Sequence, residues 1–218
     1  MAKTHTAEEV RAQCVAAMPD SLGELYFALW NQLAWLHLKW NDFRALFAES
    51  QETIDLLNEA APDFFGNLQR MMWEDLLLHL CRLTDPVKSA GKDTLTVRRI
   101  SELIPDQQLK DQVASEAENA RDKTQFARDW RNRRLAHREL PPLAGETPNP
   151  LALASRQHVE DALAALRQTM NTMAEHYLGA AVGYEHLIEA LGGVASLLSC
   201  LKMGVEARRA KLDRLRGT

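Results

Sequence analysis

Residues 21–47, SLGELYFALWNQLAWLHLKWNDFRALF, decide the fold class of this chain. Their apolar side chains recur in steps of three and four, which is the spacing of one face of an α-helix. That stripe comprises Leu22, Leu25, Leu29, Leu33, Leu36, Trp40, Phe43 and Phe47. Other apolar residues, such as Phe27 and Leu38, fall outside the stripe, so neighbouring helices must enclose this one. The segment predicts the central helix of an all-α bundle.

Similar patterns predict helices along most of the remaining chain. Pro62 opens the next helix and Asp85-Pro86 ends it, because proline fits a first helical turn but stops a helix that reaches it. The other predicted helices span 95–104, 106–138, 155–177 and 183–216. Candidate N-caps stand at Thr6, Ser21, Asp106 and Ser155.

No long run alternates with period two, so no strand is required. We therefore expect a single helical domain over 1–218, with an up-down helical bundle at 20–178. A C-terminal helical extension at 183–216 then packs on the bundle or on a dimer partner. The tryptophans Trp30, Trp35, Trp40 and Trp73 lie on helical stripes, and we expect them in the core.

Composition and charge exclude several classes of protein. The 218 residues include 26 basic and 30 acidic ones, for a net charge of −4, so any contact with RNA or DNA must be local. The three cysteines are odd in number and form no Cys-x-x-Cys pair, which indicates neither disulfides nor a zinc site and favours the reducing cytoplasm. No segment approaches the roughly 20 apolar residues that cross a bilayer, so we expect no membrane association.

Positive charge concentrates at the end of the predicted 106–138 helix. Residues 121–138 contain seven basic and two acidic side chains. The inward stripe of this helix comprises Leu109, Val113, Ala117, Ala120, Thr124 and Ala127. The next position on the stripe is Arg131, where the pattern asks for an apolar residue. A guanidinium there must be paired, extend to solvent, or face a functional cleft.

Two interpretations of this segment remain open. A basic run is most often a solvated helix face, and a single histidine near a helix end is most often a cap or a core residue. A functional site would combine Arg131 with His137, yet these residues lie about 120° apart on a regular helix. A joint site requires either a deformed last turn or a second copy of the helix.

The segment resembles the HEPN superfamily, whose signature is an arginine, a polar residue and, a few residues later, a histidine. Arg131, Asn132 and His137 meet that signature with five intervening residues. The chain further resembles the AbiU-type abortive-infection branch in segments that lie within about residues 20–140. These segments are 36–47, 82–86, 95–97, 131–132 and 136–137.

The resemblance implies a helical bundle that forms a homodimer, places two copies of the motif across a cleft and acts as a metal-independent endoribonuclease. It implies that His137 transfers protons, that Arg131 stabilises the phosphate and that Asn132 orients either group. The expected products carry a 2′,3′-cyclic phosphate and a 5′-hydroxyl. The implied RNA-binding residues are Arg128, Arg133, Arg134 and Arg138.

One position departs from the resemblance. Related toxins controlled by a nucleotidyltransferase carry a tyrosine two residues after the histidine, where this chain has Glu139. Control by modification of a tyrosine is therefore not expected here, although an antitoxin or regulatory protein remains a possible partner. The alternative function is a non-catalytic helical dimerisation or RNA-binding module. The histidines form no metal-ligand pattern and no Gly-rich phosphate loop is present, so we expect neither a metal nor a cofactor.

Overall fold

The computed structural model describes residues 6–136, 151–186 and 192–217, and these residues form two compact units. The first unit comprises Met1–Leu36 and Leu77–Glu185, and the second comprises His37–Leu76 and His186–Thr218. Helices α2 (Asp20–Phe47) and α4 (Pro62–Thr84) each contribute to both units. The described residues are almost entirely helical, which confirms the predicted all-α class.

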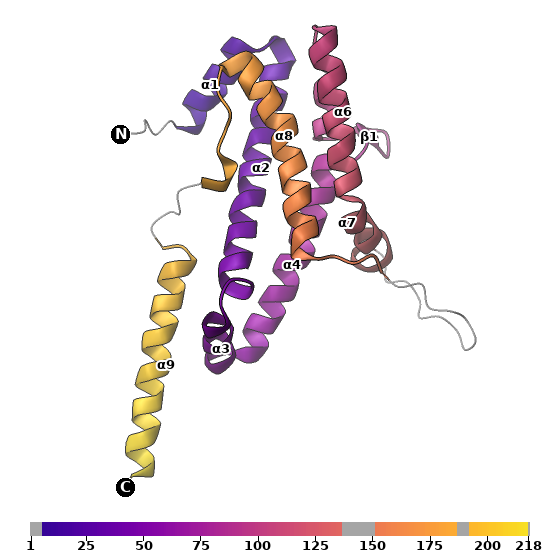
Figure 1. Ribbon diagram of the computed structural model, residues 1–218. Helices are drawn as coiled ribbons and strands as arrows, with labels where there is room; N and C mark the ends of the chain where they lie inside the picture. The colour runs from indigo at the N-terminus through magenta and orange to yellow at the C-terminus, as the bar shows by residue number, and fades with distance from the viewer. Residues whose placement is uncertain (1–5, 137–150, 187–191, 218) are drawn as a thin grey trace, which may run out of the picture. The chain divides into compact units, whose positions relative to one another are not determined.

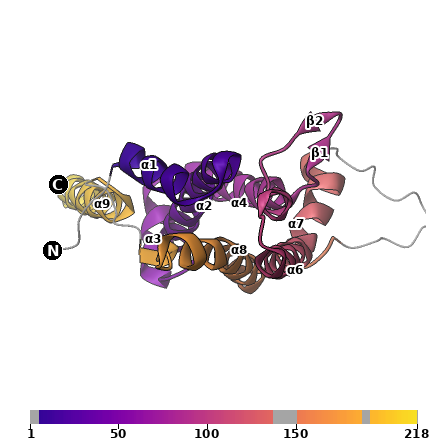
Figure 2. The same cartoon turned by 90° about the horizontal axis from the view of Figure 1, so that it is seen from above.

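The first unit contains residues 20–36 of α2 and 77–84 of α4. In Figure 1 and Figure 2, α6 and α8 run side by side, in agreement with the extensive contacts between them. Its remaining elements are α1 (Ala7–Ala17), β1 (Lys88–Ser89), β2 (Lys92–Asp93), η1 (Val97–Arg99), α5 (Ile100–Leu103), α6 (Gln107–Lys123), α7 (Gln125–Trp130), η2 (Arg131–Leu135) and α8 (Arg156–Leu178), with part of η3 (Tyr184–His186). The antiparallel strands β1 and β2 have two residues each and form a hairpin in which Ser89 pairs with Lys92.

The core of the first unit includes the predicted stripes of α2 and α6. Leu22, Leu29 and Leu33 of α2 are buried, and the α6 stripe from Leu109 to Ala120 is buried as expected. From α8, Leu163, Leu166 and Met170 join them. The three-and-four spacing therefore identified the inward faces correctly, because each helix buries the one face that carries apolar side chains.

The second unit packs α3 (Gln51–Ala60) against α9 (Val194–Arg216). Its buried cluster contains Leu46, Leu57, Phe65 and Val194, with Leu198 and Leu201 of α9 packed against it. The rings of Trp40, Phe43 and Trp73 pack against one another, with centroids 5.6 Å (Trp40–Phe43), 5.4 Å (Phe43–Trp73) and 6.5 Å (Trp40–Trp73) apart.

Several helix boundaries confirm the predicted capping chemistry. Thr6 and Glu9 form a reciprocal capping box, the Asp106 carboxylate accepts from the amide of Leu109 at 2.8 Å, and the Ser155 hydroxyl accepts from the amide of His158. Ser21 is not a cap, because α2 already begins at Asp20. Three of the four predicted N-caps are therefore confirmed, each with a side chain that accepts from a free amide in the first turn of its helix.

Three predictions about the helices were wrong. Helix α3 was not anticipated, although Ser50 caps it and accepts from the amide of Thr53. The C-terminal helix begins at Val194 and not at 183, because Gly192 has a φ of +101° and Gly193 is the N-cap. Trp35 is 54% exposed, since it lies about 100° around α2 from the buried Leu36.

The predicted 106–138 helix is interrupted. It ends at Thr124, restarts as α7 and then widens into the π-helical segment η2, whose ring closes where the amide of Ala136 donates to the Arg131 carbonyl at 2.8 Å. The Thr124 hydroxyl donates to the carbonyl of Arg121 at 2.9 Å, and such a local bond competes with regular helix. Residue 137 and those that follow it in this predicted helix lie outside the described residues. In the described part of the chain, no helix is long and apolar enough to cross a membrane.

Candidate active site

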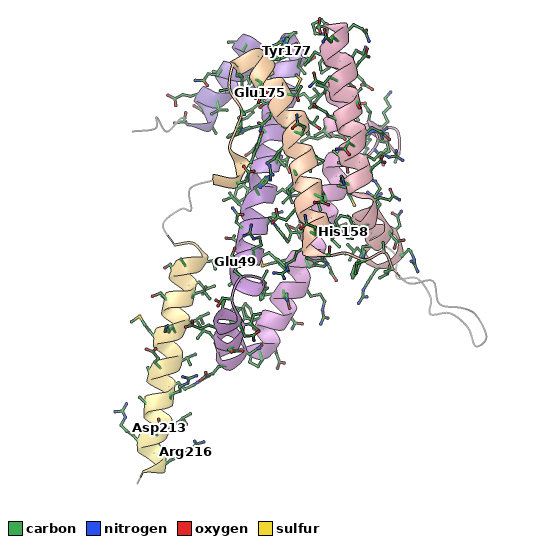
Figure 3. The ribbon with its side chains drawn as sticks, in the orientation of Figure 1. Glu49, His158, Glu175, Tyr177, Asp213 and Arg216 are labelled. Atoms are coloured by element: carbon green, nitrogen blue, oxygen red, sulfur yellow. The ribbon has the colours of Figure 1, made fainter. Side chains whose placement is uncertain are left out.

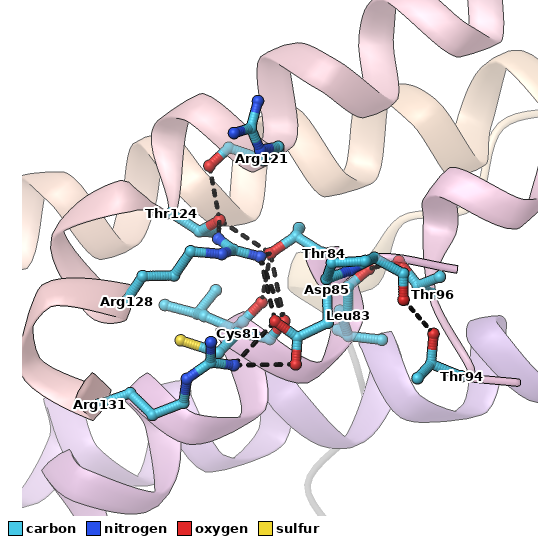
Figure 4. A network of polar contacts seen from close by, with 12 residues as sticks. Cys81, Leu83, Thr84, Asp85, Thr94, Thr96, Arg121, Thr124, Arg128 and Arg131 are labelled. Carbon is cyan, nitrogen blue, oxygen red and sulfur yellow. Dashed lines mark hydrogen bonds and ion pairs between the residues drawn. The ribbon is translucent and has the colours of Figure 1, made fainter. Parts of the chain in front are cut away.

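The candidate site forms where the end of α4 meets α7 and η2. Pro86 ends α4, so Asp85 stands just beyond the last turn with its carboxylate directed at the facing helix (Figure 4). Arg128 and Arg131 are three residues apart and lie on one helix face, from which both reach Asp85. Two guanidinium groups therefore share a single carboxylate, which leaves the cluster with a surplus of positive charge.

Arg131 is held at two points of its planar guanidinium group. Its Nη1 donates to Oδ1 and Oδ2 of Asp85 at 2.8 and 2.9 Å, and its Nε donates to the side-chain oxygen of Asn132 at 3.2 Å. The side chains of Arg131 and Asp85 are 27% and 20% exposed. Among the described residues, Nη2 of Arg131 has no hydrogen-bond partner. This nitrogen is the donor that remains for an anion.

Arg128 lies deeper, with only 11% of its side chain exposed. Its Nη1 donates to the Thr124 hydroxyl at 2.6 Å and its Nη2 to the Thr84 hydroxyl at 2.7 Å, while Nη2 lies 3.5 Å from Asp85. Burial lowers the pKa of the Arg128 guanidinium below its ordinary value, an effect that the Asp85 carboxylate opposes. At the end of α4, the Arg128 guanidinium therefore meets the Thr84 hydroxyl and the Asp85 carboxylate as acceptors.

Two buried hydroxyls connect the helices beneath Arg128. The hydroxyl oxygens of Thr84 and Thr124 lie 2.8 Å apart, and the Leu80 carbonyl oxygen lies 2.9 Å from that of Thr84. Nearby, burial raises the pKa of the Cys81 thiol to about 11, so this thiol is neutral near pH 7 and is a poor nucleophile. This polar layer connects α7 to the end of α4 through two threonines that are fully buried.

We expect Arg128→Met to lower the free energy of unfolding by about 3 kcal/mol, because it removes the partner of buried Thr84, Thr124 and Asp85 while keeping an apolar side chain. Urea denaturation followed by circular dichroism measures this change. Arg121→Met is the matched control, since Arg121 is more exposed and pairs with Glu118 on its own helix. If both variants are equally stable, Arg128 has no structural role.

The π-helical segment begins at Arg131. A π-turn inserts an extra residue into the helical ring and is found frequently at functional sites. Here it starts at the residue that interrupts the apolar stripe, and Asn132 and Arg134 in it are exposed. The last described turn, over residues 131–135, is therefore not regular α-helix, and the position of His137 relative to Arg131 stays a prediction.

The other predicted RNA-binding residues lie around Trp130. The guanidinium of Arg134 lies over the Trp130 ring at 5.5 Å from its centre, and Arg133 pairs with Asp129 at 3.5 Å. The Trp130 ring nitrogen donates to the Ala152 carbonyl at 2.8 Å, and the Ala152 amide donates to Asp129 at 2.7 Å. These two bonds fix the chain at Ala152 against α7.

The start of α8 also contacts this helix. Figure 3 shows His158 at the end of α8 nearest α7, and its ring lies 5.3 Å from that of Phe126. Its Nδ1 lies 2.7 Å from the Leu153 carbonyl, so His158 holds the segment that precedes α8 against the first turn of that helix. This histidine is structural.

The structure brings Arg128, Arg131 and Asn132 together, and Arg133 and Arg134 follow on the same segment. His137, Arg138 and Glu139 lie outside the described residues, so their roles stay predictions. Asp85, Thr84 and Thr124 were missed as site residues. Their signal was faint: an acidic residue placed between a helix end and a proline. Among the described residues, no group of three or more His, Cys, Asp or Glu side chains is arranged to hold a metal.

Comparison with protein families matches residues 19–196 to the model of the family described as AbiU2. This range includes the end of α4, α7 and η2, and therefore the whole described site. Searches of curated proteins and of solved structures gave no match.

Proposed function

This chain belongs to the AbiU2 family, an abortive-infection branch of the HEPN superfamily, and from that premise we propose that it is a metal-independent endoribonuclease. The observation that carries the proposal is the position of Arg131. Its guanidinium is anchored at Nη1 and Nε, and its side chain is partly exposed. The residue itself begins a π-turn within a basic segment. A cation held in this way suits the charge that grows on a phosphate during transfer.

The proposed reaction is an internal transesterification of RNA. The 2′-oxygen of a ribose forms a bond to the adjacent phosphorus, the bond from phosphorus to the 5′-oxygen breaks, and a cyclic phosphate and a 5′-hydroxyl result. An imidazole takes the proton of the 2′-hydroxyl, and an imidazolium returns a proton to the leaving oxygen. We assign these proton transfers to His137 and stabilisation of the phosphate to Arg131.

The remaining assignments follow the charges around the motif. Arg133, Arg134 and Arg138 neutralise neighbouring RNA phosphates, whereas Arg128 primarily holds α7 against α4. Asn132 orients Arg131 through its side-chain oxygen. We further propose a homodimer in which the two motif helices face each other. In abortive infection the protein would act by cutting RNA, and an antitoxin or other regulatory protein would restrain this activity.

The purified protein is expected to cut single-stranded RNA in EDTA, because no assigned step needs a metal. The fragments should accept a 5′ label from polynucleotide kinase without prior phosphatase treatment, which reports 5′-hydroxyl ends. The same oligonucleotide with 2′-O-methyl riboses is the matched control and should stay intact, because its nucleophile is blocked. Cleavage of the methylated RNA, or cleavage only with a divalent cation, contradicts the mechanism.

The alternative is a helical module that binds RNA or a second copy without catalysis. It is favoured if the protein binds RNA in a fluorescence anisotropy assay yet cuts no RNA over a long incubation.

A further inference from the structure

We infer that Asp85 is a positioning residue for RNA cleavage, one that aims the Arg131 guanidinium at the scissile phosphate. The inference rests on the proposed function and adds to it the residue that follows α4, far from the motif in the sequence. Asp85 does not contact the RNA in this account. It acts through Arg131.

The contacts of Arg131 define what Asp85 does. The two Asp85 oxygens hold a single nitrogen, Nη1, while Asn132 holds Nε at the other end of the guanidinium plane. Two anchors on one rigid plane fix both its tilt and its rotation, so Nη2 has a defined direction. A long arginine side chain without such anchors samples many rotamers, and this costs transition-state stabilisation.

Asp85 itself is held in place by its surroundings. Arg128 lies 3.5 Å from Oδ1 and is in turn fixed by Thr84 and Thr124. Beyond Asp85, the Thr94 hydroxyl donates to the Pro86 carbonyl, and the Thr94 amide donates to the Val87 carbonyl at 2.9 Å. These two bonds close the base of the hairpin. The carboxylate is therefore built on a helix end and a closed turn, as precise positioning requires.

The same contacts argue against Asp85 as a simple blocking anion. A carboxylate that replaced the phosphate would pair with two nitrogens of the fork, which is the bidentate geometry that both anions prefer. Here it binds Nη1 alone and leaves Nη2 without a partner among the described residues. Its one negative charge also faces the two guanidiniums of Arg128 and Arg131, so the cluster still attracts an anion.

The test compares Asp85→Asn, Asp85→Glu and wild type on an RNA that the wild type cuts, with kcat and KM measured separately. Asp85→Asn should lower kcat about 100-fold, because the Arg131 guanidinium is no longer held in one orientation by a carboxylate. Its Kd for the 2′-O-methyl RNA should be unchanged or slightly tighter, because a repulsive charge is gone. Asp85→Glu restores the carboxylate and should recover at least about tenfold of the lost kcat.

Asp93→Asn is the matched control. Asp93 also pairs with an arginine, Arg99, at 3.0 Å and lies a few residues further along the chain, but it does not contact Arg131. It should leave kcat unchanged. Thermal unfolding of each variant normalises the rates to folded protein, so a loss of stability is not read as a loss of positioning.

Three results overturn the inference, and they are distinguishable. If wild type cuts RNA and Asp85→Asn is equally fast per folded molecule, only the role of Asp85 fails. If Asp85→Asn is faster, the carboxylate competes with the phosphate and does not aim Arg131. If wild type cuts no RNA, the proposed function fails, and the positioning role fails with it.

Discussion

His137→Ala is expected to reduce RNA cleavage about 1,000-fold, because a positioned acid or base contributes about 10²- to 10⁴-fold. Imidazole is the one side chain in the motif that both accepts and returns a proton near neutral pH. Gel analysis of labelled RNA under single-turnover conditions measures the loss. Binding of the 2′-O-methyl RNA should persist, because the basic residues of the segment remain.

His176→Ala provides the matched control for His137→Ala. His176 is exposed near the end of α8 and contacts the Tyr177 ring, away from α7 and η2. Its variant should cut RNA at the wild-type rate. If His137→Ala cuts as fast as this control, the proton-transfer assignment is wrong and another group performs it.

Arg131→Ala is expected to lower kcat by about 10³-fold, which is the upper end of the loss seen when one preorganised donor to a developing anion is removed. Arg131→Lys should recover little of this activity. A lysine has a single nitrogen on a flexible stem, so it cannot keep the contact with Asp85 and still present a second, oriented nitrogen.

Arg121→Ala serves as the control for Arg131→Ala, since it removes an equal charge from the same basic segment without touching Asp85. The comparison separates catalysis from charge, because the Arg121 variant should bind RNA more weakly but keep the wild-type kcat. Equal kcat values for the Arg131 and Arg121 variants would show that Arg131 contributes only to binding. Urea denaturation confirms that the Arg131 variants are folded.

The two substitutions also decide between the candidate functions. A nuclease loses turnover in both variants while retaining RNA binding. A helical binding module has no turnover to lose, so only affinity or dimerisation changes when Arg131 is replaced.

Much of the bundle could be predicted from local patterns. The buried stripes of α2 and α6, the caps at Thr6, Asp106 and Ser155, and the end of α4 before Pro86 all follow from chemistry within one or two turns. The break at Thr124 could not be predicted in this way. Its hydroxyl partner, Thr84, is 40 residues away, and only packing brings the two together.

The residues of the candidate site also differ in whether local sequence could predict them. Arg131 could be predicted as a site residue because it follows Ala127 on an otherwise apolar stripe, and this signal is local. Asp85 gave no comparable signal, since nothing near it in the sequence indicates which cation it meets. Arg128 was expected to bind RNA, but the structure places its guanidinium against Thr84 and Thr124.

By itself, the sequence determined the helical class, most helix ends, the basic segment and the resemblance that the family match over 19–196 confirms. Helical periodicity and capping depend on residues three or four positions apart, so a linear pattern contains them. Only the tertiary structure decided that Asp85 holds Arg131, that Arg128 is enclosed, and that the motif helix breaks and widens. These features depend on which side chains meet across two helices, and the free energy of satisfying buried polar groups there overrides the local preference for a continuous helix.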